Sequence, residues 1–323
     1  MVQGVRSFWS SGTGILLLTL LILIAGVSGL SILLIHDVTH PSRSTTSLDP
    51  ADLSVRVEEI EFEAADGIPL SGWFVRGRPG WPAILLCHDL GSSRLDLLAT
   101  MVPLSRSGYP ILMFDFRGHG MSGGGGATLG ILERLDIIGA IEHLKQRDDI
   151  DTGRVGILGI GQGAYAAALA ALEREEIRVL ALDSIYPDVA TQLDRLIGDR
   201  LPPLLQRVVP VVGLFYNPYL SFRMKGSVIS ESIGVLADRN ILFIAAARTP
   251  GRFREQQKLY EALPDDPSGD SSFIEMEGSG VTGLYGEERK AYDEMIVSFF
   301  SRNLRGGGAQ GRGSGNALRV VDP

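Results

Sequence analysis

The sequence has few of the residues on which disulfides, metal sites and nucleic-acid binding depend. Its one cysteine, Cys87, can form neither an internal disulfide nor a cysteine-based zinc site. Acidic residues outnumber basic ones by 38 to 30, so the chain has no electrostatic footprint for a nucleic acid. All five histidines lie at or before His143. Chemistry that needs a histidine later in the chain is therefore excluded.

A long uncharged run lies near the N-terminus, at residues 14–35 (GILLLTLLILIAGVSGLSILLI). As a helix it reaches about 33 Å, enough to cross a bilayer core. A cleaved signal peptide, the alternative, has a shorter apolar stretch of roughly 7 to 15 residues and a small-residue cleavage site that is not evident here. We therefore expect a single-pass membrane anchor. Arg6 before the run and Asp37 after it favour a cytoplasmic N-terminus and an extracytoplasmic remainder.

Composition divides the rest of the chain, which is 45% apolar and 21% charged and can bury a sizeable core. We expect an N-terminal tail at 1–13, a linker at 36–54 rich in Ser, Thr and Pro, and a flexible Gly-rich tail at 305–323. What remains, 55–304, fits one α/β domain. No internal repeat is evident.

Short apolar runs alternate with helical patterns in this domain. Residues 55–62 and 70–75 flank Asp66-Gly67 and predict an antiparallel hairpin. Near-continuous apolar runs, typical of parallel strands covered on both faces, occur at 83–87, 111–114, 155–160, 179–182, 241–246 and 273–276. Helical spacing occurs at 94–107, 130–147, 164–174, 254–263 and 287–304. The alternation predicts a mostly parallel, doubly wound α/β sheet with an N-terminal antiparallel hairpin.

The segment 186–240 interrupts this alternation and is longer than a usual connection. We interpret it as an inserted helical cap. Its stretch 204–216 (LLQRVVPVVGLFY) is strongly apolar but contains Pro210 and is too short to span a membrane. A helix packed on the core is the favoured interpretation, and a roof over a pocket or a contact with the bilayer surface are the alternatives.

Three glycine-containing loops follow three of the predicted parallel strands: CHDLG at 87–91, DFRGHGMSG at 115–123 and GIGQG at 159–163. In order and spacing they resemble the α/β-hydrolase superfamily, and more narrowly its membrane-anchored serine-hydrolase-like branch. That branch pairs an HG-type loop, a D-x-R-G-x-G-x-S loop and a nucleophile elbow. The resemblance covers roughly 59–303 and implies an α/β-hydrolase fold with an inserted cap.

The positions that match the family's catalytic triad are all substituted. The elbow has Gly161, which suits the strained turn but has no atom able to attack a carbonyl. Thr249 stands where the family has its acid, and Val281 where it has its histidine. No histidine follows His143, so a shifted alignment restores no base in the family's chain order. We therefore expect a catalytically inactive pseudo-hydrolase that binds a ligand or serves as a scaffold for a partner.

The family's oxyanion hole consists of backbone N–H groups, which match Leu90 and Gln162 in this sequence. Such donors do not depend on side chains, so we expect that a small acyl or carboxylate-like ligand could still be held there. His88, Asp89 and Asp183 follow the strands around this point and are candidates for a residual pocket. No metal site is expected.

Two other functions stay open. An atypical esterase, lipase or peptidase would need an unconventional nucleophile; Cys87 is a poor candidate, because a free cysteine is usually buried and its neighbour His88 points to the opposite face of a strand. A dinucleotide-binding protein is the other, since Gly159, Gly161 and Ala164 fit G-x-G-x-x-A with Asp183 about 20 residues on. Gly118, Gly120 and Gly123 fit a similar pattern, which shows how often it arises by chance. No cofactor is expected on the favoured interpretation.

Overall fold

The computed structural model describes residues 12–43, 55–214, 228–246, 250–264, 269–276 and 284–305. The chain divides into two compact units. One contains residues 1–39 and 190–225, and the other contains residues 40–189 and 226–323. The expected triad positions Thr249 and Val281, and the expected tail from residue 306 onward, lie outside the described residues.

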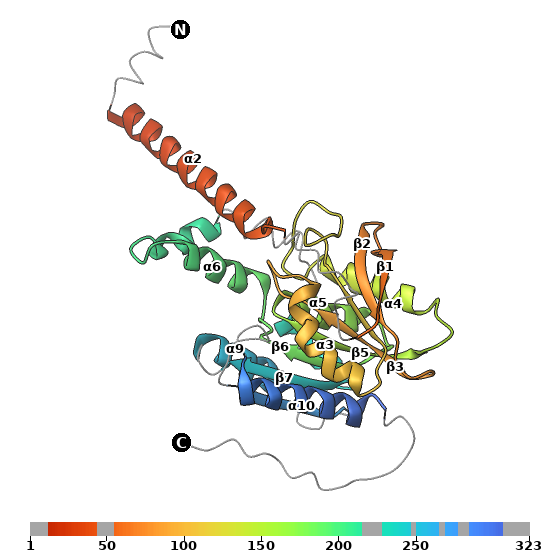
Figure 1. Cartoon of the computed structure of the whole chain (residues 1–323). Coiled ribbons are helices and arrows are strands. Elements are labelled where there is room, and N and C mark those ends of the chain that lie inside the picture. Colours follow the sequence, from red (N-terminus) through yellow and green to blue (C-terminus); the bar gives the residue numbers. More distant parts are fainter. Residues whose placement is uncertain are drawn as a thin grey trace. The chain divides into compact units, whose positions relative to one another are not determined.

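The larger unit is built on an eight-stranded sheet with the order β1-β2-β4-β3-β5-β6-β7-β8 (Figure 1). The pairs β1–β2 and β2–β4 are antiparallel, and all other neighbours are parallel. The strands are β1 Val57–Glu63, β2 Pro69–Val75, β3 Pro82–Cys87, β4 Ile111–Phe114, β5 Asp151–Ile160, β6 Ile177–Asp183, β7 Asn240–Ala246 and β8 Ser271–Met276. The predicted hairpin and the predicted parallel strands are thereby confirmed.

Helices cover both faces of this sheet, because the side chains of each central strand alternate between two apolar layers. On one face, Ile84 and Leu158 share a buried cluster with Leu104 of α3 and Phe300 of α10. Helices α4 and α5 lie side by side and contact the sheet. The helical elements of this unit are η2 Arg94–Leu97, α3 Leu98–Arg106, α4 Glu133–Leu144, α5 Gln162–Glu173, α8 Ile229–Ser232, η4 Ile233–Leu236, α9 Pro250–Glu261 and α10 Gly286–Asn303.

The smaller unit contains the apolar helix α2 (Gly12–Thr39) and a part of the insertion, with α6 (Val189–Arg200) and η3 (Gln206–Val208). The sequence predicted that the apolar segment ends at Ile35, but the helix continues for one more turn to Thr39. Polar residues after the run do not stop a helix, whereas Pro41 cannot continue one. The predicted linker therefore begins with a helical turn.

The described residues after α2, from His40 to Arg43, are part of the larger unit. The Arg43 guanidinium donates to the backbone carbonyls of Ser122 and Gly124, at 2.7 and 2.6 Å. These two residues belong to the loop that follows β4. The beginning of the expected linker is thus attached to one of the loops at the carboxyl edge of the sheet.

Candidate functional site

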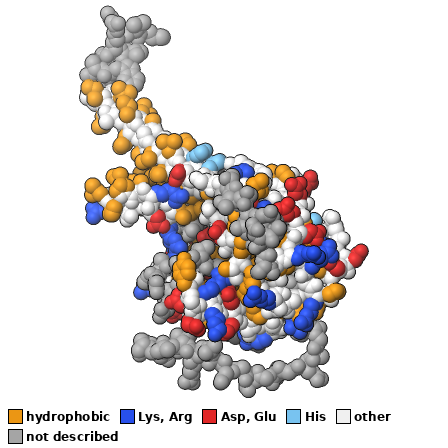
Figure 2. All heavy atoms as spheres, in the orientation of Figure 1, with side chains coloured by type: hydrophobic (Ala, Val, Ile, Leu, Met, Phe, Trp, Pro, Cys, Tyr) orange, Lys and Arg blue, Asp and Glu red, His pale blue; other side chains and the backbone are white. Residues whose placement is uncertain are grey.

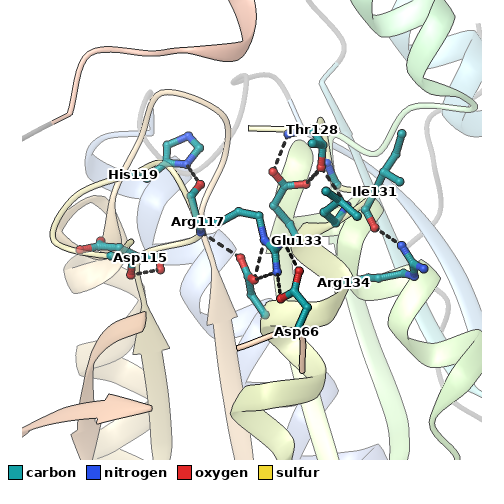
Figure 3. Close-up of polar contacts among 12 residues, drawn as sticks. Asp66, Asp115, Arg117, His119, Thr128, Ile131, Glu133 and Arg134 are labelled. Carbon is teal, nitrogen blue, oxygen red and sulfur yellow. Dashed lines mark hydrogen bonds and ion pairs between the residues drawn. The ribbon is translucent and has the colours of Figure 1, made fainter. Parts of the chain in front are cut away.

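The loop after β4 is held by a buried ion-pair network (Figure 3). The Arg117 Nη2 atom lies 2.6 Å from Oδ1 of Asp136 on α4 and 2.7 Å from Oδ1 of Asp66 in the β1–β2 turn. The Arg117 backbone N–H also donates to Asp136. Burial raises the pKa of Asp136 to about 7, and the contacts with Arg117 oppose that rise. The arginine of the D-x-R-G-x-G-x-S motif therefore holds the loop in place.

Asp115, the first residue of that motif, closes the same loop. Its Oδ1 accepts the Arg94 backbone N–H at 2.8 Å, and its Oδ2 accepts the Met121 backbone N–H at 3.0 Å. Gly120 has a φ of 43°, and a Cβ there would lie 2.1 Å from the Asp115 Oδ2 atom. Only glycine fits at this position. The motif thus builds a rigid edge beside the site.

Two histidines fix the backbone around the loops. His88 accepts the Phe116 backbone N–H on Nε2 at 3.0 Å, and its Nδ1 lies 2.8 Å from the Asp89 carbonyl oxygen. His119 accepts the Gly91 backbone N–H on Nε2 at 3.1 Å, and its Nδ1 lies 3.0 Å from a carbonyl oxygen of its own loop. Burial lowers the pKa of His88 to about 4 and also lowers that of His119. Both rings use both nitrogens for the backbone, so neither is placed as a general base.

The elbow between β5 and α5 has the strained geometry that its position demands. Gly161 has φ 51° and ψ −110° and directly precedes the first residue of α5. β3 and β5 are neighbours in the sheet, with Cys87 opposite Gly159, so the residues two positions later come to face each other. A Cβ on Gly161 would lie 2.1 Å from Oδ1 and 2.4 Å from Cγ of Asp89. The Asp89 carboxylate therefore occupies the space of an elbow side chain.

The same carboxylate fills the oxyanion hole. Asp89 Oδ1 accepts the Leu90 N–H at 2.7 Å and the Gln162 N–H at 2.8 Å. Burial raises the pKa of Asp89, and these two N–H donors oppose the rise because they stabilise the ionised form. The sequence led us to expect two donors ready for an external anion. In the structure they converge as expected, but on an oxygen of the chain itself.

The sequence led us to expect Asp183, at the end of β6, in a pocket at the carboxyl edge of the sheet. The structure has such a pocket, and Asp183 is not among the residues that line it. Its Oδ2 accepts a hydrogen bond from the Tyr292 hydroxyl of α10 at 3.1 Å, and its Oδ1 accepts one from Ser184 at 2.8 Å. Burial raises its pKa to about 6. Ser184 adopts a φ of 57°, which turns the chain at the strand end, and lines the pocket in its place.

The pocket at this edge has a volume of about 380 Å³. It is lined by His88, Asp89, Leu90, Gly91, Ser92, Asp96, Leu97, Ile160, Ser184 and Arg252. The Arg252 side chain comes from the first turn of α9, and its buried Nε–H has no hydrogen-bond partner among the residues that the structure describes. Its charge also lowers the pKa of Asp89, although less than burial raises it. The pocket thus offers one unused donor on a cationic side chain.

The structure shows the positions of the other candidate residues and of two that the sequence did not indicate. Cys87 is fully buried, as expected for a free cysteine, and burial raises the pKa of its thiol. Among the described residues, no group of three His, Cys, Asp or Glu side chains could hold a metal ion. Sequence reasoning missed Arg252 and the position of the Asp89 carboxylate. The signal for Asp89 was its presence where an HG-type loop has glycine.

Comparisons with known proteins agree with this fold. The profile of the alpha/beta hydrolase family matches residues 84–299. The alpha/beta hydrolase domain-containing protein WAV2 of Arabidopsis thaliana is 28% identical over 148 residues, which cover 44% of this chain and 47% of that protein. The protein YfhR of Escherichia coli O157:H7 is 31% identical over 148 residues, which cover 43% of this chain and 51% of YfhR. The chain thus spans about half the length of these relatives.

Among solved structures, an esterase of Pyrococcus furiosus, Pf2001, superposes with a TM-score of 0.65 at 23% identity. The match covers 83% of this chain and 99% of the esterase. At that level of identity the likeness shows the fold and leaves the activity of this chain open.

Proposed function

The chain belongs to the alpha/beta hydrolase family, and from this premise we propose that it is a membrane-anchored member that binds a small ligand without hydrolysing it. The observation that carries the proposal is the Asp89 carboxylate, which stands in the space of an elbow side chain and accepts both N–H groups of the oxyanion hole. A substrate carbonyl needs those donors at the moment when charge develops on its oxygen. In this site they are already engaged.

The other parts of the hydrolytic machinery fit the same proposal. Gly161 has no nucleophilic atom, and the ring nitrogens of His88 and His119 are occupied by the backbone. The Asp183 carboxylate accepts hydrogen bonds from Tyr292 and Ser184. In an active triad an acid of this kind would orient a histidine.

The ligand we propose is a small acyl or carboxylate-like compound. A pocket of about 380 Å³ suits a small molecule, and the Arg252 guanidinium supplies a cation with an unused N–H. Arginine binds carboxylates through paired hydrogen bonds. Asp89 next to it repels a second anion, so the ligand binds Arg252 at the expense of the interaction between Arg252 and Asp89.

The membrane part of the proposal rests on α2. The structure contains one helix with the length and composition of a membrane span, at Gly14–Thr39, among the residues it describes, and a signal sequence has the same features. Most side chains along this helix are exposed, and Figure 2 shows hydrophobic ones gathered on it. The extracytoplasmic location of the larger unit, expected from Arg6, stays a prediction.

A dinucleotide is a poorer fit to the same turn. Pyrophosphate binding at G-x-G-x-x-A uses the N–H groups at the start of the following helix. Here the Gln162 N–H, the first of α5, donates to Asp89. A bound phosphate would meet a carboxylate at this point.

Turnover of p-nitrophenyl butyrate by the full chain in detergent micelles tests the absence of hydrolysis. We expect the natural protein, Asp89→Asn and Gly161→Leu to give the same rate, equal to that of buffer with micelles. The asparagine keeps the shape of Asp89 but removes its nucleophilic charge, while leucine at the elbow fills the site. Turnover that Asp89→Asn abolishes would show that the site hydrolyses esters with Asp89 as an unconventional group.

Binding of butyrate, followed by saturation-transfer NMR, tests the ligand site. We expect Asp89→Asn to bind more tightly than the natural protein, because the repelling charge is gone, and Arg252→Gln to lose binding. Arg254→Gln is the matched control, since Arg254 is exposed on the same helix. Equal loss in both arginine variants would mean that general charge, and not the pocket, attracts the carboxylate.

A further inference from the structure

The insertion exposes large apolar side chains over a short stretch. Leu204 is 80% exposed, Leu205 47%, Val211 45% and Leu214 70%. In the described part of the larger unit, exposed large apolar residues occur singly and far apart in the sequence, at Met121, Val235 and Tyr285. Single exposed residues are normal on a soluble surface, whereas a cluster marks a binding surface.

This exposure is not due to poor packing of the segment. Val209 and Val212 of the same stretch are 8% and 1% exposed, so one side of it is packed. Val211 and Leu214 are also three residues apart, and they lie on the exposed side of the stretch. This helical segment is apolar on both sides, and one side is packed against the protein. Its other side is therefore suited to an apolar environment.

The neighbour of this stretch within its own compact unit indicates what that environment is. Residues 190–225 form one unit with residues 1–39, which include α2. The Arg200 Nε atom lies 2.6 Å from the Asp37 Oδ2 atom. Asp37 is the first Asp, Glu, Lys or Arg after the uncharged run of α2, so in a membrane-spanning α2 it marks the level at which the helix leaves the bilayer. Arg200, four residues before Leu204, is held at that level.

We propose that residues 204–214 of the insertion lie in the interfacial region of the same lipid bilayer that α2 crosses. The exposed leucines would enter the boundary of the acyl chains, and the exposed Arg207 among them would extend toward lipid phosphates. Figure 2 shows hydrophobic side chains both along α2 and on the insertion. The inference rests on the proposed span, and it adds a second membrane contact to it.

Site-directed spin labelling of the full chain in vesicles of phosphatidylcholine and phosphatidylglycerol tests this. The native Cys87 is fully buried and its thiol pKa is raised, so it does not compete for the label. Labels are placed in Leu204→Cys and Leu214→Cys, with Leu21→Cys as the reference for the span and Val235→Cys as the reference for water. The measured quantity is the ratio of collision rates with oxygen, which concentrates in lipid, and with a water-soluble nickel chelate.

We expect ratios at positions 204 and 214 several-fold above that at 235 and below that at 21. A low ratio at 204 and 214 with a high ratio at 21 would overturn the second contact and leave the span. A low ratio at 21 would overturn the span itself, and the inference with it. Dipolar broadening at 204 that disappears on dilution with unlabelled chain would assign the surface to a second copy and also overturn the inference.

Discussion

A serine introduced at position 161 should clash sterically with Asp89. A double-mutant cycle can measure this clash as a coupling energy between the two positions. A Cβ on Gly161 would lie 2.1 Å from Oδ1 of Asp89, so the carboxylate must leave its place in Gly161→Ser. It then loses the hydrogen bonds from Leu90 and Gln162. Hydrogen bonds to a charged group contribute about 1.5 to 3 kcal/mol each. Because the pocket is open to water, we take a net loss of about 2 to 3 kcal/mol for the pair.

A side chain at a φ of 51° adds strain of about 1 to 2 kcal/mol. Gly161→Ser should therefore lower the free energy of unfolding by about 3 to 5 kcal/mol in the natural background. In the Asp89→Gly background the obstruction is absent and only the strain remains, about 1 to 2 kcal/mol. The coupling energy between the two positions is then about 2 to 3 kcal/mol, in the range found for residues in contact.

The assay is urea unfolding of the full chain in detergent micelles, followed by tryptophan fluorescence, for which Trp73 is a buried reporter in β2. Gly125→Ser is the matched control, because a Cβ at Gly125 would meet no atom within 4 Å. It should have the same small effect in both backgrounds. If Gly161→Ser costs the same in both backgrounds within about 0.5 kcal/mol, Asp89 does not occupy the elbow and the basis of the proposed function fails.

Two further predictions concern stability. The folded pKa of Asp183, about 6, is above the unfolded value of about 3.9, so its stabilising contribution is complete below pH 4 and is lost as the pH rises through 6. Asp183→Asn should remove this loss. Between pH 4 and pH 8, the free energy of unfolding of the variant in urea should therefore rise by about 2 to 3 kcal/mol relative to that of the natural protein. An equal difference between the two proteins at both pH values would contradict the reasoning. Gly120→Ala places a Cβ 2.1 Å from the Asp115 carboxylate at a φ of 43° and should cost more than about 3 kcal/mol in the same assay, whereas Gly125→Ala should stay within about 0.5 kcal/mol.

The elements of the sheet could be predicted because burial leaves a direct trace in the sequence. Runs such as 83–87 and 241–246 are apolar at every position, and each became a strand buried on both faces, β3 and β7. The helix α2 extends from Gly12 to Thr39, four residues beyond the end of the uncharged run at Ile35. The sequence signal for a membrane span is the absence of charged residues. The end of the helix has a different cause, because the helical backbone cannot continue through Pro41.

The candidate site could be predicted in part. The donors Leu90 and Gln162 converge as the loop motifs indicated, because backbone N–H groups follow from the turn and not from side chains. The Arg252 side chain could not be assigned to the pocket, since it comes from a helix after the last but one strand and belongs to none of the three motifs. The same holds for Ser184, which replaces Asp183 because of its positive φ.

The sequence by itself determined the order of the strands and helices, the uncharged helix and the lack of a nucleophile at Gly161, because each depends on residues that are neighbours in the chain. The occupant of the elbow was decided only by the tertiary structure. Asp89 and Gly161 meet because β3 pairs with β5, which places Cys87 opposite Gly159 and the two following loops face to face. The contact between Asp89 and Gly161 could be predicted from the sequence only if the order of the strands in the sheet were known. That order results from packing across the whole domain.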